Sequence, residues 1–371
     1  MKFKPLNRPR KLTASAAAQV VACVDLFCGA GGLTHGLRKV GVNVVAGVDF
    51  DRACEFPYTA NHPGVAFHNR DVAGLPSSTI AEWFGNADVR VLAGCAPCQP
   101  FSSYSQRYDT IGTDRWGLLN HFARFVTELT PDIVTMENVP TLERHQVFDD
   151  FVATLTSCNY HVWYGVVDCA EYGLPQRRRR TVLLASLHGH ISLRPPEVSQ
   201  LRTVGDALKC LPRLRHGTSN RRDPLHTAAR LSSLNYERIL ASKPGGSWRD
   251  WPPRLVAKCH RKKSGKTYPG VYGRMRRDEP APTLTTQFFG FGNGRFGHPT
   301  QARALSLREG AILQGFPQGY KFVEHGRPVH LKTLGRLIGN AVPVQLGKVL
   351  GESIIDHIKS HINPCGVSAK Y

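Results

Sequence analysis

Two thiols, Cys95 and Cys98, lie close together in the segment GCAPCQPFS, which covers residues 94–102. The apolar run Val89 to Gly94 precedes them and predicts a buried strand. A thiol at the carboxyl end of a parallel strand faces the crevice where open α/β sheets bind ligands, and the amino terminus of a following helix lowers the pKa of a thiol from about 8.5. The pattern therefore predicts Cys98 as a nucleophile.

The pair Cys95-x-x-Cys98 is also compatible with a redox centre or with half of a metal site. Structural zinc usually takes four ligands, and no second pair of cysteines or histidines has the spacing to complete such a site. We therefore expect no metal. The redox alternative stays open at this point, because Pro97 between the thiols is compatible with it.

A glycine-rich turn, DLFCGAGG at Asp25 to Gly32, separates a predicted strand from a predicted helix. Glycine allows a sharp turn and a close approach of a ligand to the backbone at the start of a helix. The turn is not the dinucleotide fingerprint, because Thr34 stands where that pattern needs its third glycine. Asp49 ends the next strand and can accept both hydroxyls of a ribose, and Asp71 can face an adenine amino group. These residues predict a nucleoside-bearing cofactor, although such a turn can also be a connection without a ligand.

Two more polar segments adjoin predicted strands. ENV, Glu137 to Val139, ends an apolar run, and QRRRR, Gln176 to Arg180, precedes the run Thr181 to Leu187. A strand-end glutamate is often only a surface residue, and four arginines can be a solvated charge run. At the edge of the same sheet where ligands bind, however, guanidinium groups can hold a phosphate or a base carbonyl.

The elements that must position these residues alternate between strand and helix through the first 180 residues. This alternation predicts a parallel, doubly wound α/β sheet. Expected strands are Val20–Phe27, Val42–Asp49, Val89–Gly94, Asp132–Met136 and Thr181–Leu187, and expected helices are Leu33–Val40, Leu118–Leu129 and Phe148–Cys158. From Pro195 to His298 turn signals dominate, and helical patterns return at Ser306–Gln314 and Leu334–His357, the latter interrupted by GNAVP.

The formal charge of the 371-residue chain is +20, and it is unevenly distributed. Residues 1–180 carry 18 Lys/Arg against 17 Asp/Glu, whereas residues 181–300 carry 21 against 7, an excess of 14. An excess confined to one segment is what binding a polyanion requires, although a solvated basic surface is the simpler alternative. We expect Arg276 and Arg277 to be among the residues that meet phosphates.

The remaining composition excludes several classes of protein. No apolar run reaches the roughly 18 to 20 residues of a membrane span, and the amino terminus does not resemble a signal peptide. The ten cysteines are scattered without the density of a disulfide-rich secreted domain, so we expect reduced thiols. These features predict a soluble, cytoplasmic protein that does not associate with membranes.

In chain order, DLFCGAGG, GVDFD, GCAPCQPFS, ENV, QRRRR and IGNAVPV (338–344) resemble the motif series of DNA cytosine-5 methyltransferases. The resemblance extends from about residue 21 to residue 355, and six motifs in order are far more specific than any one. It implies a doubly wound, Rossmann-like class I methyltransferase sheet with a smaller, irregular target recognition domain inserted. The expected divisions are a basic extension at 1–20, a catalytic and cofactor-binding domain at 21–190, the target recognition domain at 191–300 and a return to the catalytic domain at 301–371.

The resemblance implies S-adenosylmethionine (S-adenosyl-L-methionine) as the cofactor. The implied pocket consists of Phe27, Gly29, Gly31, Asp49, Phe50, Asp71, Pro97, Leu118, Asn340 and Val342. Phe27 would stack on the adenine, Asp49 would hold the ribose and Asp71 would face the adenine edge. Because Asn340 and Val342 close the pocket from the C-terminal segment, the end of the chain should pack back onto its beginning.

The implied catalytic residues are Cys98, Glu137, Arg178 and Arg180. Cys98 would add to C6 of cytosine, Glu137 would protonate N3, and the arginines would fix the ring oxygen and the surroundings of the thiol. Arg177 or Arg179 could replace either arginine, because the run of four leaves the register open. A stacked base is out of reach, so the cytosine must be flipped out, and residues 102–117 fit a lid over it.

The implied partner is double-stranded DNA, with the cognate restriction endonuclease of the same system as a further candidate partner and a monomeric state expected. Three rival interpretations remain: a Rossmann-type oxidoreductase with a C-x-x-C centre, a catalytically silent nucleic-acid binder, and a family member that acts on RNA. The missing third glycine and the basic middle segment disfavour the first, and the intact Cys98, Glu137 and Arg178 disfavour the second. The long basic segment favours duplex DNA over RNA.

Overall fold

The computed structural model of the chain describes residues 20–96, 117–197 and 200–362. Within these ranges the chain forms two compact units. The first takes the residues up to 167, residues 179–196 and the residues from 344 onward, and the second takes residues 168–178 and 197–343.

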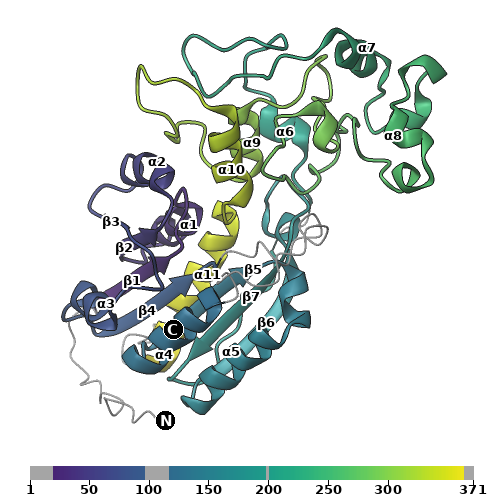
Figure 1. Cartoon of the computed structure of the whole chain (residues 1–371). Helices are drawn as coiled ribbons and strands as arrows, with labels where there is room; N and C mark the ends of the chain where they lie inside the picture. Colours follow the sequence, from purple (N-terminus) through teal and green to yellow (C-terminus); the bar gives the residue numbers. More distant parts are fainter. Residues whose placement is uncertain (1–19, 97–116, 198–199, 363–371) are drawn as a thin grey trace, which may run out of the picture. The chain divides into compact units, whose positions relative to one another are not determined.

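The first unit is built on a seven-stranded sheet with the order β3-β2-β1-β4-β5-β7-β6 (Figure 1). The strands are β1 (Val21–Leu26), β2 (Val44–Asp49), β3 (Ala66–Asn69), β4 (Val89–Gly94), β5 (Ile133–Asn138), β6 (His161–Asp168) and β7 (Arg179–Ser186). Neighbours from β3 to β5 pair in parallel, so the carboxyl ends of these five strands lie along one edge. This confirms the predicted α/β sheet and brings the strand-end residues to the same edge.

The last two strands differ from the expectation of a purely parallel sheet. β7 pairs with β5 in the antiparallel direction, with Glu137 opposite Val182 and Asn138 opposite Thr181. A parallel return needs a crossover of a dozen or more residues, and β6 and β7 are joined by only residues 169–178. No strand was predicted at β6, whose residues are mostly half-buried without a regular alternation of buried and exposed positions.

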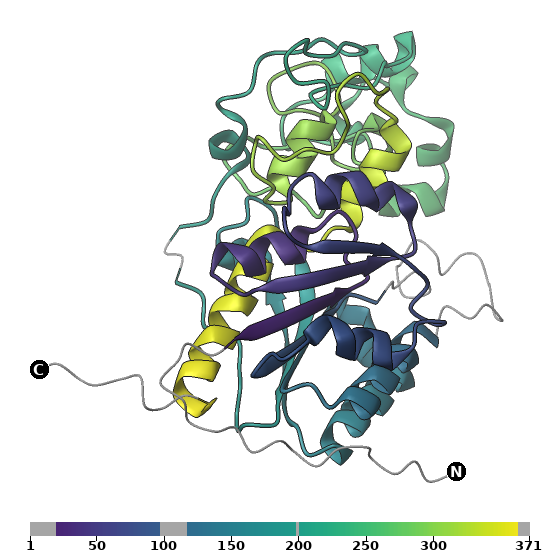
Figure 2. The same cartoon turned by 90° about the vertical axis from the view of Figure 1, so that its left-hand side faces the viewer.

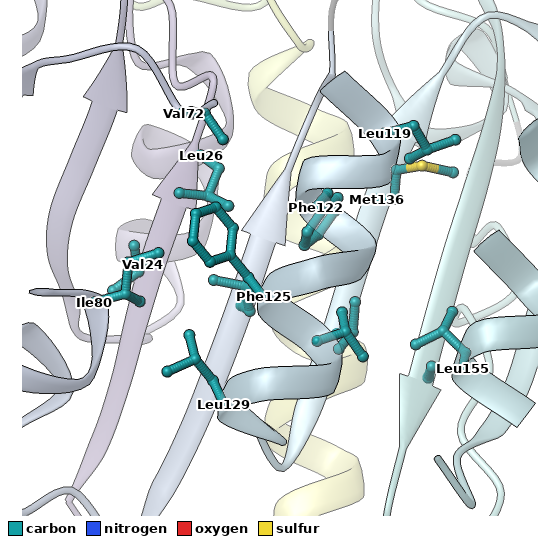
Figure 3. Close-up of a cluster of buried hydrophobic side chains, with 14 of the residues drawn as sticks. Val24, Leu26, Val72, Ile80, Leu119, Phe122, Phe125, Leu129, Met136 and Leu155 are labelled. Carbon is teal, nitrogen blue, oxygen red and sulfur yellow. The ribbon is translucent and has the colours of Figure 1, made fainter. Parts of the chain in front are cut away.

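Helices cover both faces of the sheet. They are α1 (Gly32–Lys39), α2 (Glu55–Thr59), α3 (Ser77–Phe84), α4 (Gly117–Leu129), α5 (Gln146–Ser157) and α11 (Val344–His357). Figure 3 shows α4 in front of the strands with Phe122, Phe125 and Leu129 directed toward the sheet, and α11 behind it. Phe122 and Phe125 are fully buried in one apolar cluster with Leu26 of β1 and Met136 of β5. This core holds the carboxyl edge in place.

The C-terminal helix α11 packs closely against α1, beside which it lies in Figure 2. A Cβ atom on Gly36 would lie 2.4 Å from the carbonyl oxygen of Val344, and one on Gly347 would lie 2.8 Å from that of Leu33. Glycine is required at both positions because the two backbones approach within side-chain distance. The last α-helix of the described chain therefore packs onto the first, in line with the expected return of the C-terminal segment.

The second unit is mostly irregular. Its helices are α6 (Val204–Leu208), α7 (Ser233–Ala241), α8 (Lys258–Arg261), α9 (Leu307–Leu313) and α10 (Leu331–Asn340), and its described residues pair only through isolated bridges such as Arg274 with Gly297. Buried aromatic residues, including Trp248, Trp251 and Phe291, supply a core of its own. The assignment of 191–300 to target recognition stays a prediction, since a compact unit need not coincide with a functional domain.

None of the helices in the described ranges has the length and apolar character needed to cross a membrane.

Candidate active site

The glycine-rich turn after β1 is tied to the end of β2 through Asp49. The Oδ2 atom of Asp49 accepts a hydrogen bond from the backbone N–H of Gly29 at 2.8 Å, and its Oδ1 atom accepts one from the N–H of Asp51 at 2.8 Å. A carboxylate oxygen has more than one acceptor site, so a hydrogen bond from the backbone does not by itself prevent it from accepting a hydroxyl. The two hydrogen bonds fix the carboxylate at the carboxyl edge of the sheet.

The surroundings of Asp49 fit a nucleoside-bearing cofactor such as S-adenosylmethionine. Gly29 has a φ of 55°, and a Cβ atom built on it would meet no atom of the described residues within 4 Å, so this side of the glycine has room for a ligand. Phe50 follows Asp49 directly and is 77% exposed, which leaves its ring free to stack on a base. Gly31, with a φ of 86°, stands at the amino terminus of α1, where backbone N–H groups favour an anionic group.

The other predicted cofactor residues of the first unit lie on nearby elements. Asp71 follows β3, is exposed, and accepts a hydrogen bond from Ala73 N at 2.9 Å. Phe27 has a φ of 58°, a strained conformation for a residue with a side chain, and it packs against the buried cluster below the sheet edge. Leu118 lies in the first turn of α4 and is half-buried. Pro97 lies outside the described residues.

Sequence reasoning gave no role to Asp25, which is fully buried beneath the glycine-rich turn. Its Oδ2 atom accepts a hydrogen bond from Thr34 Oγ1 at 2.6 Å, and the Thr34 hydroxyl lies 2.9 Å from that of Tyr58. The Oδ1 atom of Asp25 is buried and makes no hydrogen bond within the described part of the chain. Burial raises the pKa of Asp25 to about 7, and the charge of Asp49 adds to this effect.

Glu137, near the end of β5, is paired with Arg180 on the adjacent strand β7. The Nε atom of Arg180 lies 2.8 Å from the Oε1 atom of Glu137, and the two side chains are only 11% and 9% exposed. The contact is an ion pair by distance, yet among the described residues the buried Oε1 atom has no partner with hydrogen-bond alignment. A buried carboxyl group with one oxygen available in this way can form a hydrogen bond to a ring nitrogen and protonate it.

Asn138, the residue after Glu137, contacts the segment that leads toward the predicted nucleophile. Its Nδ2 atom donates a hydrogen bond to the carbonyl oxygen of Ala96 at 3.2 Å, and its Oδ1 atom accepts one from Val139 N. Cys95 and Ala96 follow β4, whereas Cys98 and the predicted lid up to residue 116 lie outside the described residues. Sequence reasoning assigned no role to Asn138, although the ENV motif contains it.

In the second unit, Arg178 is 2% exposed and donates to backbone carbonyl oxygens. Its Nη1 atom lies 3.2 Å from Leu284 O, and its Nη2 atom lies 3.1 Å from Gly339 O and 3.4 Å from Ala341 O. The guanidinium group thus fixes the IGNAVPV segment to the segment around Thr283–Leu284. Holding buried carbonyl oxygens is a structural task.

Gln176 takes part in the same buried network, and its role was not predicted. Its Nε2 atom donates to Leu313 O at 3.0 Å and to Gln314 Oε1 at 2.7 Å, while its Oε1 atom accepts from Leu284 N at 2.8 Å. The predicted cofactor residues Asn340 and Val342 belong to the segment that this network supports, and Asn340 is exposed whereas Val342 is buried.

The alternatives left open within the four-arginine run differ in their surroundings. Arg177 is largely exposed and lies 3.5 Å from Asp168, and Arg179 is exposed. Only Arg178 and Arg180 are buried, each in its own unit.

The fold and the site together define a class. A seven-stranded sheet of this order, with a glycine-rich turn after β1 and acids after neighbouring parallel strands, is a Rossmann-like methyltransferase domain. The family model for C-5 cytosine-specific DNA methylases matches residues 21–356. The chain belongs to this family and is a DNA (cytosine-5)-methyltransferase.

Curated relatives of similar length support this assignment. The chain is 46% identical over 340 residues to the Type II methylase M.HgiDII of Herpetosiphon aurantiacus, a match that covers 90% of this chain and 95% of that protein. It is 29% identical over 337 residues to the Type II methyltransferase M1.HphI of Haemophilus parahaemolyticus, with 90% and 86% covered.

Solved structures share the fold. A candidate DNA modification methyltransferase from an Escherichia coli prophage superposes with a TM-score of 0.70 at 23% identity, covering 91% of this chain and 99% of that one. The S. pombe Dnmt2 methyltransferase superposes with a TM-score of 0.56 at 17% identity, with 93% and 99% covered.

Proposed function

We propose that the chain transfers a methyl group from S-adenosylmethionine to C5 of a specific cytosine in double-stranded DNA, through a covalent bond between Cys98 and C6. The observation that carries the proposal is the buried Glu137–Arg180 pair at the carboxyl edge of the sheet. Glu137 lies on β5, which is next to the strand that leads into the Cys98 segment.

The cofactor is proposed to bind at the turn between β1 and α1. Asp49 would accept the ribose hydroxyls, the open face of Gly29 would lie against the methionine moiety, and Phe50 would stack on the adenine. Phe27 packs into the apolar cluster, so the exposed ring of Phe50 is the better stacking surface of the two. When bound, S-adenosylmethionine supplies an electrophilic methyl group to the carbon activated by the protein.

The residues of the chain perform the remaining chemistry. C5 of cytosine is too weak a nucleophile by itself, so the Cys98 thiolate adds to C6 and the electron pair moves toward N3, where Glu137 donates a proton. The resulting enamine carbon C5 forms the new bond to the methyl group. Loss of the C5 proton to a base then expels the Cys98 thiolate and restores the aromatic ring. Arg180 would hold the ring oxygen and orient Glu137.

The surroundings of Arg178 change its proposed role. Its guanidinium donors are directed at the carbonyl oxygens of Leu284, Gly339 and Ala341, so we propose a positioning residue and assign the base contact to Arg180. Arg177 and Arg179 are less suited to either task, because exposed guanidinium groups are screened by water.

The substrate is proposed to be duplex DNA from which the target cytosine is flipped out, since C6 cannot be reached in a stacked base. Two relatives are named a Type II methylase and a Type II methyltransferase, so we propose a restriction-modification role with a companion endonuclease. The protein is proposed to act as a monomer.

The experiment is to express the chain in a host that lacks cytosine methylation and to map 5-methylcytosine in its genome. Methylation of one cytosine within a single recurring sequence is expected. Absence of methylation in DNA, or methylation confined to RNA, would contradict the proposal. The variant Cys98→Ala is the control, because it should leave the DNA unmodified while keeping the fold.

A further inference from the structure

Four exposed arginines surround a hollow of about 550 Å³ in the second unit. Arg213, Arg215, Arg221 and Arg222 line it, together with uncharged residues of the segment 212–222, and we call this surface the arginine groove. The sequence has no acidic residue between Asp206 and Asp223. The groove therefore concentrates positive charge within one short loop.

The arginines of the groove differ from three other exposed arginines of the unit, each of which pairs with a carboxylate. Arg254 lies 2.6 Å from Glu237, Arg276 lies 2.7 Å from Asp278, and Arg327 lies 3.4 Å from Glu324. No such ion pair involves an arginine of the groove among the residues that the structure describes. Within the described residues the four arginines of the groove therefore keep a positive charge that no carboxylate offsets through an ion pair.

Arg276 illustrates the difference, because sequence analysis selected it as a phosphate contact. Both Asp278 and Glu279 approach its guanidinium group, at 2.7 and 3.1 Å, and offset its charge. A DNA phosphate would have to displace these carboxylates. The groove presents guanidinium groups without that competition.

The backbone of the groove is held at its first end by buried side chains. The Nε2 atom of the fully buried His226 lies 2.8 Å from Pro212 O, and its Nδ1 atom lies 2.8 Å from the hydroxyl of Ser306, the cap of α9. Leu214 N donates to Gln301 Oε1 at 2.9 Å. These contacts hold the backbone on both sides of Arg213.

The second end is fixed by an ion pair and a turn. The Nε and Nη2 atoms of Arg308 lie 2.7 and 3.0 Å from the carboxylate oxygens of Asp223. Asn220 Oδ1 accepts hydrogen bonds from the N–H groups of Arg222 and Asp223 at 2.8 and 3.1 Å. Because the loop is ordered in advance, binding an anion there costs less conformational entropy.

We propose that the arginine groove binds the phosphodiester backbone of duplex DNA. The inference rests on the proposed function and adds to it a surface that fixes the position of the duplex. Guanidinium groups match phosphate oxygens in geometry and charge, and backbone contacts give register and affinity without reading sequence. The groove thus contributes affinity that is independent of the recognised bases.

The test compares two double variants, R213Q/R215Q and R221Q/R222Q, with the control R254Q/R327Q, which removes the same charge from ion-paired arginines. One duplex contains the target sequence that the enzyme methylates, and a second duplex has a scrambled sequence. Binding of both is measured over a range of salt concentrations. Each groove variant should lose about 0.9 in the slope of log affinity against log salt per phosphate contact removed. Its affinity should fall about tenfold or more for both duplexes alike. The control should keep the wild-type slope.

A wild-type slope in both groove variants would overturn the proposal, as would an equal loss in the control, since net charge alone would then explain it. A loss of affinity confined to the duplex with the target sequence would also contradict the proposal, because that result indicates base readout. Thermal unfolding checks that the variants fold, and charge-preserving R213K/R215K should retain most of the slope. If wild-type protein methylates DNA and the groove variants bind DNA normally, only the proposal for the groove is overturned. If wild-type protein does not bind duplex DNA, the proposed function is overturned as well.

Discussion

Arg180 Nε lies 2.8 Å from Glu137 Oε1, and the pair is formed across two antiparallel strands, β7 and β5. The alignment of these strands places Glu137 opposite Val182, two residues beyond Arg180. The ion pair is therefore diagonal, and it leaves the Oε1 atom without an aligned hydrogen bond among the described residues. This geometry suits a carboxyl group that orients toward a substrate and exchanges a proton with it.

We expect Glu137→Gln to lower kcat by about 10² to 10⁴, because an amide can hydrogen-bond N3 but cannot protonate it. Binding of DNA and cofactor should change little. Single-turnover methyl transfer at saturating substrates measures the effect. A variant that retains wild-type kcat would remove Glu137 from the mechanism.

The two buried arginines should respond differently to substitution. Arg180→Gln should lower kcat even in protein that stays folded at the assay temperature, since its proposed partners are Glu137 and the base, although loss of the buried ion pair should also lower thermal stability. Arg178→Gln should destabilise the fold by about 1 to 3 kcal/mol, because carbonyl oxygens of Leu284, Gly339 and Ala341 lose their donors. Calorimetric melting and kinetics on both variants test this division. The reverse pattern would return the base contact to Arg178.

Asp49→Ala should weaken cofactor binding by about 1.5 to 3 kcal/mol, the contribution of charged hydrogen bonds to the ribose. Asp88→Ala is a matched control, because Asp88 also accepts a backbone N–H, that of Val20, yet does not adjoin the glycine-rich turn. Isothermal titration calorimetry with S-adenosylmethionine measures both variants. Equal affinities in Asp49→Ala and wild-type protein would show that the cofactor binds elsewhere.

Asp25 should make stability depend on pH. Its pKa rises from 3.8 to about 7 on folding because of burial, so the folded state holds the proton more tightly than the unfolded state. The stabilisation is complete below about pH 4 and is lost as the pH rises toward 7, at a rate of at most about 1.4 kcal/mol per pH unit. In Asp25→Asn this component should vanish. Urea unfolding at several pH values tests it, and parallel pH profiles for the two proteins would contradict it.

The sequence was sufficient for the features that local pattern determines. Apolar runs predicted β1, β2, β4 and β5, and they placed the glycine-rich turn after β1, Asp49 at the end of β2 and Glu137 near the end of β5, where the structure has them. It was insufficient where long-range packing decides: the direction of β7 depends on the short connection after β6, and the surroundings of Arg178 depend on carbonyl oxygens more than 100 residues away. The arginine groove could not be predicted for the same reason, since a sequence shows which residues are charged but not which carboxylates pair with them in space.

The most direct test of the central claim is trapping on DNA that carries 5-fluorocytosine at the target position. Cys98 can add to C6 and the methyl group can be transferred, but fluorine cannot leave C5 as a cation, so the thiolate cannot be expelled. A denaturation-resistant protein–DNA adduct should form only with S-adenosylmethionine present. It should be absent in Cys98→Ser, because a hydroxyl supplies almost no anion near neutral pH, and retained in Cys95→Ser. An adduct that persists in Cys98→Ser, or none in the wild-type protein, would contradict the account.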